Sequence, residues 1–139
     1  MGRLSPFGEE VVKEMNRQGI MVDMSHASEK SFWDVIKLSK APIICSHSSS
    51  MAMCKHDRNL TDEQLKALAQ NGGVAQVCLL DRYINEDYKN ASLTDAIEHI
   101  DHMVKVAGID HVGSALILMA VAELSVAKVT TISYRSLLN

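Results

Sequence analysis

The chain has 139 residues, a formal net charge of −3 and 47% hydrophobic residues, a composition typical of one globular domain with its own core. It carries no stretch of basic residues that could neutralise phosphates, so we expect no nucleic-acid partner. The longest apolar run, residues 115–122, is far shorter than the roughly 18–20 residues that cross a bilayer, so we expect no membrane segment.

The first half of the chain alternates helix and strand signals. Ser5 and Pro6 are typical of a helix start, and apolar spacing predicts a helix that ends at Gly19. Residues 20–24 predict a strand, and a second helix follows from Ser28. Residues 42–45 predict a second short strand, and a serine and a histidine follow both predicted strands.

The second half repeats this alternation. Thr61 and Gln64 form a capping box for a helix that stops at residues 71–73, and residues 74–80 predict a third strand. Residues 81–91 read as a polar loop, Ser92 starts a long helix, and a fourth strand begins at residues 111–113. This order predicts a parallel α/β fold, and the apolar strands lead us to expect helices over the sheet.

Functional residues of parallel α/β folds gather at the C-terminal ends of the strands. His26 and His47 both follow a predicted strand, each directly after a serine. Two imidazoles on neighbouring strands could meet at one metal ion. The alternative is that each histidine is only hydrogen-bonded to its surroundings, and Asp23 is expected to be a buried partner rather than a ligand.

Other polar residues leave alternatives open. His99 and His102 are three residues apart on a predicted helix, where they could bind metal, although a solvated helix face is the expected setting. Arg58 could hold a substrate carboxylate with its planar guanidinium or be a surface arginine. The serines of CSHSSS lack a Gly-x-Ser-x-Gly elbow and are expected to be turn and capping hydroxyls.

Three segments resemble the membrane dipeptidase family (renal dipeptidase, peptidase M19) in motif, order and spacing: GRLSPFGEEVVKEMNRQGIMVDMSHAS, APIICSHSSS and HDRNLTDEQLKALAQNGGV. The resemblance implies that residues 1–113 are the C-terminal portion of a (β/α)₈ barrel. We therefore expect an α/β fold that is a partial TIM-type barrel, with roughly the fifth to eighth strand units. The implied activity is zinc-dependent hydrolysis of dipeptides to amino acids, with two zinc ions in the complete family site.

The resemblance also assigns roles to residues. His26 and His47 match zinc ligands of the family, and Arg58 matches the arginine that binds the substrate carboxylate. The family's first-strand His-x-Asp motif and its bridging glutamate are not matched, so the catalytic residues stay unknown. We expect the chain alone to be weak or inactive as a dipeptidase. The alternative is a non-catalytic α/β fragment that acts as an oligomerising or binding module, and a homo-oligomer is compatible with both.

The two ends of the chain carry further expectations. The start, MGRLSPFGEE, has no apolar stretch of a signal peptide. The odd set of three cysteines favours a reducing compartment, so the cytoplasm is the expected location of the chain as given. After GIDHVG the family continues with Ile-Gly-x-Asp-Phe-Asp-Gly, whereas SALILMAVAE follows in this chain. Our hypothesis is that residues 114–139 are a divergent, out-of-frame tail, which the parent DNA sequence would test.

Overall fold

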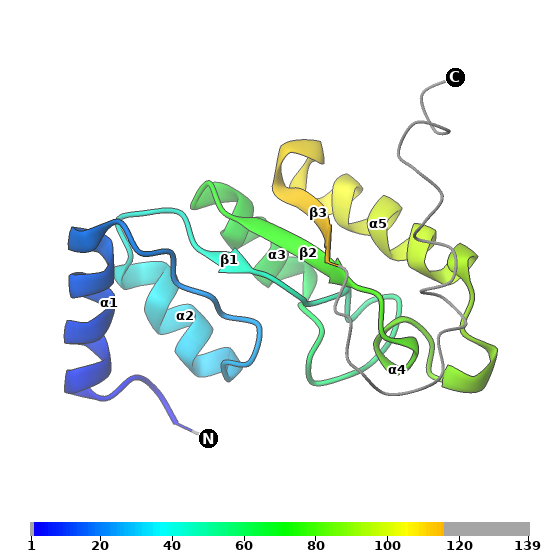
Figure 1. Cartoon of the computed structure of the whole chain (residues 1–139), viewed down its shortest axis with the longest axis horizontal. Helices are drawn as coiled ribbons and strands as arrows, with labels where there is room; N and C mark the ends of the chain where they lie inside the picture. The colour runs from blue at the N-terminus through cyan, green and yellow to red at the C-terminus, as the bar shows by residue number, and fades with distance from the viewer. Residues whose placement is uncertain (1, 116–139) are drawn as a thin grey trace.

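The computed structural model describes residues 2–115, which form a parallel α/β structure (Figure 1). Its elements in chain order are α1 (Pro6–Gln18), α2 (Glu29–Leu38), β1 (Ile44–Cys45), α3 (Asp62–Gln70), β2 (Val74–Cys78), α4 (Asp81–Ile84), the 3₁₀ turn η1 (Tyr88–Asn90), α5 (Leu93–Ala107), the 3₁₀ turn η2 (Ile109–His111) and β3 (Val112–Ala115). The expected out-of-frame tail lies outside the described residues, except for Ser114 and Ala115 in β3.

Local sequence signals set the helix boundaries. Ser5 caps α1 by accepting a hydrogen bond from the Gly8 amide, and Gly19 ends this helix with a φ of 72°, a left-handed conformation that suits glycine. Both hydrogen bonds of the capping box between Thr61 and Gln64 are present at the start of α3. The predicted helix starts are therefore confirmed, because each depends on contacts between residues close in sequence.

The strands lie side by side in the order in which the chain visits them. β1, β2 and β3 are parallel neighbours in that order. Residues 22–24 extend the sheet beyond β1, because the Ile44 amide donates to the Val22 carbonyl (2.9 Å) and the Met24 amide donates to the Ile44 carbonyl (2.8 Å). The predicted strand at 20–24 is thus shorter than expected. Continuing this register would bring Met21 opposite Pro42, which has no amide hydrogen to donate.

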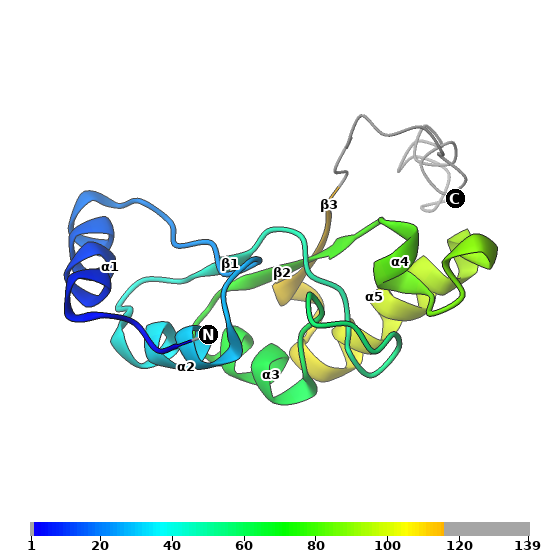
Figure 2. The ribbon, with the colours of Figure 1, turned by 90° about the horizontal axis from the view of Figure 1, so that it is seen from below.

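The helices pack on one side of this sheet. Figure 2 shows α2, α3 and α5 in a row along one side of the strands, and α3 contacts β2 while α5 contacts both β2 and β3. Along β2, Ala75 and Val77 are fully buried in the main core, whereas Gln76 between them is only half-buried. Successive strand side chains point to opposite faces of a sheet. In the described part of the chain, the expected cover of helices is therefore present on the face to which Ala75 and Val77 point.

Residues 81–91 are more regular than the predicted loop, because they contain α4 and η1. The expected solvated face for His99 is also wrong, since its side chain is only 1% exposed. Its Nδ1 accepts a hydrogen bond from the Ser50 amide (3.0 Å), and its Nε2 lies 3.1 Å from the Ile84 carbonyl oxygen. The imidazole can be buried because both ring nitrogens have backbone partners. His102 instead pairs with Asp62 (2.7 Å).

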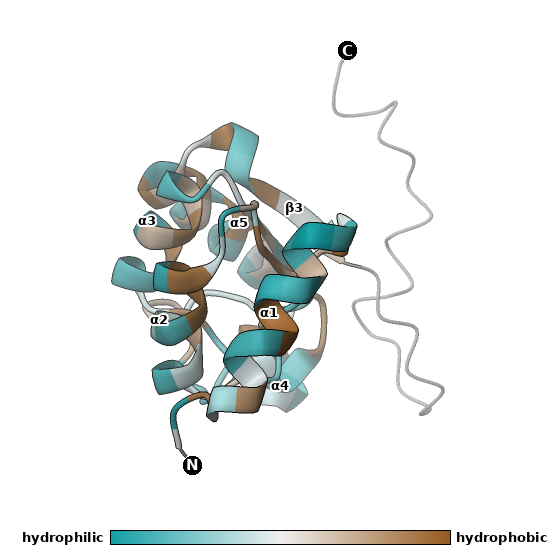
Figure 3. Cartoon of the chain, turned by 90° about the vertical axis from the view of Figure 1, so that its left-hand side faces the viewer, coloured by the Kyte–Doolittle hydropathy of each residue, from teal (hydrophilic) through white to brown (hydrophobic). Residues whose placement is uncertain are grey.

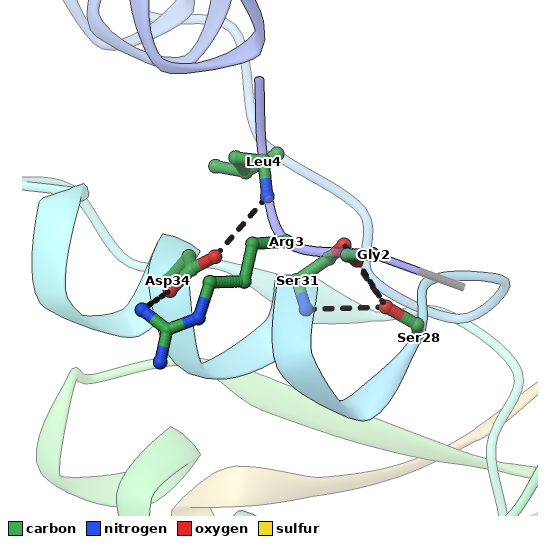
Figure 4. A network of polar contacts seen from close by, with 6 residues as sticks. All are labelled: Gly2, Arg3, Leu4, Ser28, Ser31 and Asp34. Atoms are coloured by element: carbon green, nitrogen blue, oxygen red, sulfur yellow. Dashed lines mark hydrogen bonds and ion pairs between the residues drawn. The ribbon is translucent and has the colours of Figure 1, made fainter. Parts of the chain in front are cut away.

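The segment before α1 packs against α2 (Figure 4). The Ser28 and Ser31 hydroxyls both donate to the Gly2 carbonyl oxygen, at 3.1 and 3.2 Å. The Leu4 amide donates to Asp34 on the next turn of the helix (3.1 Å). Because Ser28 is also the N-cap of α2, these contacts fix the beginning of the helix that follows His26.

The three cysteines are free thiols buried in the fold. Burial, together with the nearby Asp23 carboxylate, raises the pKa of Cys45 to about 12, so this thiol is inert at neutral pH. None of the helices that the structure describes has the length and apolar character needed to cross a bilayer.

We predict that His99 makes folding sensitive to acid. Burial is the main cause that lowers the pKa of His99 below its ordinary value of 6.5. The unfolded chain therefore binds the proton more readily, and stability falls as the pH drops below about 6.5. His99→Phe should cost about 1–3 kcal/mol at pH 7.5, because it leaves the Ser50 amide and Ile84 carbonyl unpaired. Urea unfolding at pH 7.5 and 5.5 should show that this cost shrinks in acid; an equal cost at both pH values would contradict the prediction.

Candidate functional site

Two of the predicted site residues meet at the C-terminal end of the sheet. His26 follows residues 22–24 and His47 follows β1, and these two segments pair in parallel. The parallel pairing brings the Nε2 atoms of the two rings to 2.7 Å, with ring centroids 4.8 Å apart. The structure thus brings together two residues that are 21 positions apart in sequence.

Asp23 organises the backbone on both sides of this pair. Its Oδ1 accepts hydrogen bonds from the Ser25 amide (3.0 Å) and the Ser46 amide (3.2 Å), and its Oδ2 accepts from the Ser46 hydroxyl (2.5 Å). Partial burial raises the pKa of Asp23, but these hydrogen bonds outweigh burial and leave the pKa below its ordinary value. Asp23 is thus an ionised partner of the site, as expected, but its side chain is exposed rather than buried.

His47 is held by the two serines that precede the histidines. Its Nδ1 lies 2.7 Å from the Ser46 hydroxyl, and its amide donates to the Ser25 hydroxyl (2.9 Å). Burial, followed by the positive charge of Arg58 and by the neighbouring His26 ring, lowers the pKa of His47. The ring is therefore neutral at neutral pH and keeps a lone pair on one nitrogen.

Arg58 reaches the same group of residues from the next loop. Its Nε donates to the Ser25 carbonyl (3.0 Å), and its guanidinium carbon lies 5.4 Å from the centre of the Tyr83 ring. Its Nη2 is buried and has no hydrogen-bond partner within residues 2–115. The Nε side of the guanidinium is therefore fixed, and Nη2 is left without a partner among the described residues.

The loop that carries Arg58 is tied down on both sides. Asn59 donates from one amide nitrogen to the carbonyls of Cys54 and Tyr83, both at 2.8 Å. The Leu60 amide donates to the Ser49 carbonyl (2.8 Å), which pairs the end of the loop with the segment after β1. These contacts hold the backbone of Arg58 beside the end of β1.

A cavity of about 410 Å³ connects these parts of the site. His26, Arg58 and Ser48 line it, together with residues from the beginnings of α2 and α3. The Ser48 hydroxyl is buried and, like Arg58 Nη2, is unpaired among the described residues. The cavity is therefore lined by an imidazole and by two residues that each carry an unpaired buried polar atom, a polar lining that suits a polar ligand.

The sequence did not reveal what Ser25 and Ser46 do. Ser46 was expected to be a turn or capping hydroxyl and Ser25 was given no role, yet each links the Asp23 carboxylate to the backbone or ring of His47. The signal that could have identified them is their repeated position, since each comes directly before a histidine at a strand end.

The two facing imidazole nitrogens match the ligand type that zinc prefers, but not the usual number of ligands. Zinc accepts histidine nitrogen at about 2.0–2.1 Å and in most sites takes four ligands. Within residues 2–115, no group of three or more histidine, cysteine or acidic side chains is close enough together to hold a metal ion. The described part of the chain therefore brings together two imidazole nitrogens, fewer than the four ligands that most zinc sites take.

Comparison with known proteins places this arrangement in a family. The family model for membrane dipeptidase (Peptidase family M19) matches residues 1–117. An uncharacterized dipeptidase of Schizosaccharomyces pombe is 45% identical over 111 residues, which is 79% of this chain and 27% of that protein. Dipeptidase tcpJ of Claviceps purpurea is 41% identical over 110 residues, 79% of this chain and 26% of that protein. The chain thus spans about a quarter of the length of these relatives.

A solved structure agrees with the sequence relatives. The crystal structure of a metallo peptidase from Rhodobacter sphaeroides, liganded with a phosphinate mimic of the dipeptide L-Ala-D-Ala, superposes with a TM-score of 0.79 at 35% identity. The superposition covers 83% of this chain and 34% of that one. With a family model that matches most of its length, the chain belongs to the membrane dipeptidase family, peptidase family M19.

Proposed function

We propose that this chain carries part of the active site of a zinc-dependent dipeptidase, with His26 and His47 as metal ligands and Arg58 as the substrate-carboxylate ligand. The observation that supports it best is the 2.7 Å approach of the two Nε2 atoms. Two imidazoles that face each other through their outer nitrogens are arranged to share a cation.

The fold supports a barrel as the scaffold of this site. Strands that are adjacent in chain order and parallel, with helices along one side, are the pattern of a (β/α)₈ barrel, whose helices lie outside the strands. We therefore propose that residues 1–113 form roughly its fifth to eighth strand units. In such barrels the site lies at the C-terminal ends of the strands, where His26 and His47 lie.

The proposed chemistry is hydrolysis of a peptide bond between two amino acids. Bound at such a site, zinc would supply Lewis-acid polarisation of the scissile carbonyl. The chain's own contribution is to hold two imidazoles in place and to keep the Arg58 guanidinium beside the adjoining cavity. A free carboxylate fits the unpaired edge of Arg58, since guanidinium and carboxylate form paired, charge-assisted hydrogen bonds.

Dipeptides are the substrate class that we propose. The Rhodobacter sphaeroides relative was crystallised with a mimic of L-Ala-D-Ala, a ligand that ends in a carboxylate. A dipeptide presents that carboxylate a short distance from its single peptide bond, so an arginine beside the metal ligands can position the bond by gripping the carboxylate.

A non-catalytic oligomerising or binding module is the second candidate. It is favoured by exposed apolar side chains on and after α1: Phe7 is 73%, Met21 59% and Ile20 50% exposed. The apolar bands on the visible side of α1 appear brown in Figure 3. Exposed apolar groups of this kind favour contact with another chain or a second copy. Under this alternative the histidines would be structural, and zinc binding would not depend on them.

Zinc binding tests the proposed ligands. We expect the purified chain to bind zinc, and His26→Ala or His47→Ala to abolish measurable binding, because a single imidazole remains. His102→Ala is the matched control, since His102 pairs with Asp62 and not with the site. Competition with a chromophoric chelator at pH 7.5 gives the affinities. Equal affinities in all four proteins would contradict the assignment.

Ligand binding tests Arg58. We expect Arg58→Ala to weaken binding of a phosphinate mimic of L-Ala-D-Ala by about ten- to a hundredfold, the range for losing a charged hydrogen-bond pair. Arg58→Lys should restore little, because an ammonium cannot make the paired contact. NMR titration of the zinc-loaded chain measures this. Arg17→Ala serves as the control, since Arg17 pairs with Glu14 on α1, and an Arg58→Ala affinity equal to this control would contradict the role.

Catalysis by the chain alone should be weak or absent. Only two nitrogen ligands converge within the described residues, so the metal should be held loosely and incompletely. We expect zinc-loaded chain to hydrolyse Ala-Ala no faster than the His26→Ala variant, as measured by release of free alanine. Rapid hydrolysis that requires His26 would overturn this expectation.

A further inference from the structure

We propose that Asp23 and Ser46 are positioning residues that fix the tautomer of His47 so that its Nε2 lone pair faces His26. This inference rests on the proposed function for its consequence in metal binding. The tautomer itself does not depend on any metal.

The direction of each hydrogen bond follows from counting protons. The Oδ1 atom of Asp23 already accepts from two backbone amides, those of Ser25 and Ser46. Its Oδ2 lies 2.5 Å from the Ser46 hydroxyl oxygen. An ionised carboxylate only accepts, so the single hydroxyl proton of Ser46 points toward Asp23.

The Ser46 oxygen must then act as an acceptor toward His47. It lies 2.7 Å from His47 Nδ1, and its own proton is already used. The hydrogen in this second bond therefore belongs to the ring, on Nδ1. A neutral imidazole carries one ring hydrogen, so Nε2 of His47 is left with a lone pair. That atom is the one that faces His26 at 2.7 Å.

The opposite arrangement is unfavourable on electrostatic grounds. If Ser46 donated to His47 instead, its oxygen lone pairs would face Asp23 Oδ2 at 2.5 Å with no hydrogen between them. The same rotamer of Ser46 cannot satisfy both neighbours as a donor. A carboxylate that orients a ligand histidine through its inner nitrogen is a common way to hold metal ligands, and in this chain a serine lies between the two groups.

The geometry also explains why the two serines differ. Ser25 supports His47 through the backbone, since its hydroxyl accepts from the His47 amide (2.9 Å). Ser46 contacts the ring itself. Removal of the Ser46 hydroxyl therefore changes which ring nitrogen carries the proton, whereas loss of an unrelated serine hydroxyl does not.

NMR of the zinc-free chain tests the tautomer directly. Long-range ¹H–¹⁵N spectra at pH 8 should show His47 protonated on Nδ1 in the wild type and shifted toward Nε2 protonation in Ser46→Ala. Asp23→Ala is the second variant, and it removes the acceptor of the Ser46 hydroxyl proton. Ser31→Ala is the control, because Ser31 contacts Gly2 and Ser28 instead. His47 protonated on Nε2 in the wild type, or an unchanged tautomer in both Ser46→Ala and Asp23→Ala, would overturn the proposal.

Zinc affinity tests the consequence. Ser46→Ala and Asp23→Ala should each weaken zinc binding by about tenfold, the lower end of the usual effect of such supporting residues, because Asp23 is exposed to water. The double variant should lose little more than Asp23→Ala alone, since Ser46 acts through its bond to Asp23. Unchanged zinc affinity beside a shifted tautomer would overturn the role in metal binding. Affinity that is unchanged in His26→Ala and His47→Ala would refute the proposed metal site but leave the tautomer result intact.

Discussion

Two backbone hydrogen bonds between residues 22–24 and β1 determine the geometry of the whole site. They run from the Ile44 amide to the Val22 carbonyl and from the Met24 amide to the Ile44 carbonyl. In a parallel pair both chains point the same way, so the residues that follow both segments emerge at one end of the sheet. His26 and His47 meet for this reason. A shift of one residue in this pairing would direct the side chains to the other face and separate the rings.

Around this pairing, polar contacts are concentrated on one small residue. Ser25 donates its amide to Asp23, accepts from the His47 amide with its hydroxyl and accepts from Arg58 with its carbonyl. Ser25 is only 5% exposed, and its three contacts are partly buried. The proposed metal ligands and the proposed substrate ligand are thus attached to the same residue, and a displacement of Ser25 would disturb both.

The stability of this region comes from the apolar core between the sheet and its helices. Ala75 and Val77 of β2 pack with Leu65 and Leu68 of α3 and with Met103 of α5, and all of these side chains are completely buried. The polar residues at the strand ends contribute little apolar burial. The division is typical of parallel α/β proteins, in which a rigid, apolar layer of strands and helices positions reactive loops at one end. His99 links the layers, because it joins α5 to the Ser50 amide and the end of α4.

Much of the fold could be predicted from the sequence, because helix ends depend on neighbours within a few residues. Ser5, Thr61 and Ser92 cap their helices through contacts that span three positions. The alternation of helices and short strands likewise predicted the parallel α/β class. The length of the strand at 20–24 was predicted wrongly, since it depends on Pro42, a residue in another segment.

The candidate site likewise has some features that could be predicted from the sequence and others that could not. The sequence by itself determined that His26 and His47 follow strands and that Arg58 lies in the next loop. Only the tertiary structure decided that the two Nε2 atoms face each other, that Asp23 is exposed and that His99 is buried. Helix capping and strand order are local properties of the chain. The approach of the two rings and the burial of His99 depend on contacts between distant segments, such as His26 with His47, 21 residues apart, and Ser50 with His99, 49 residues apart.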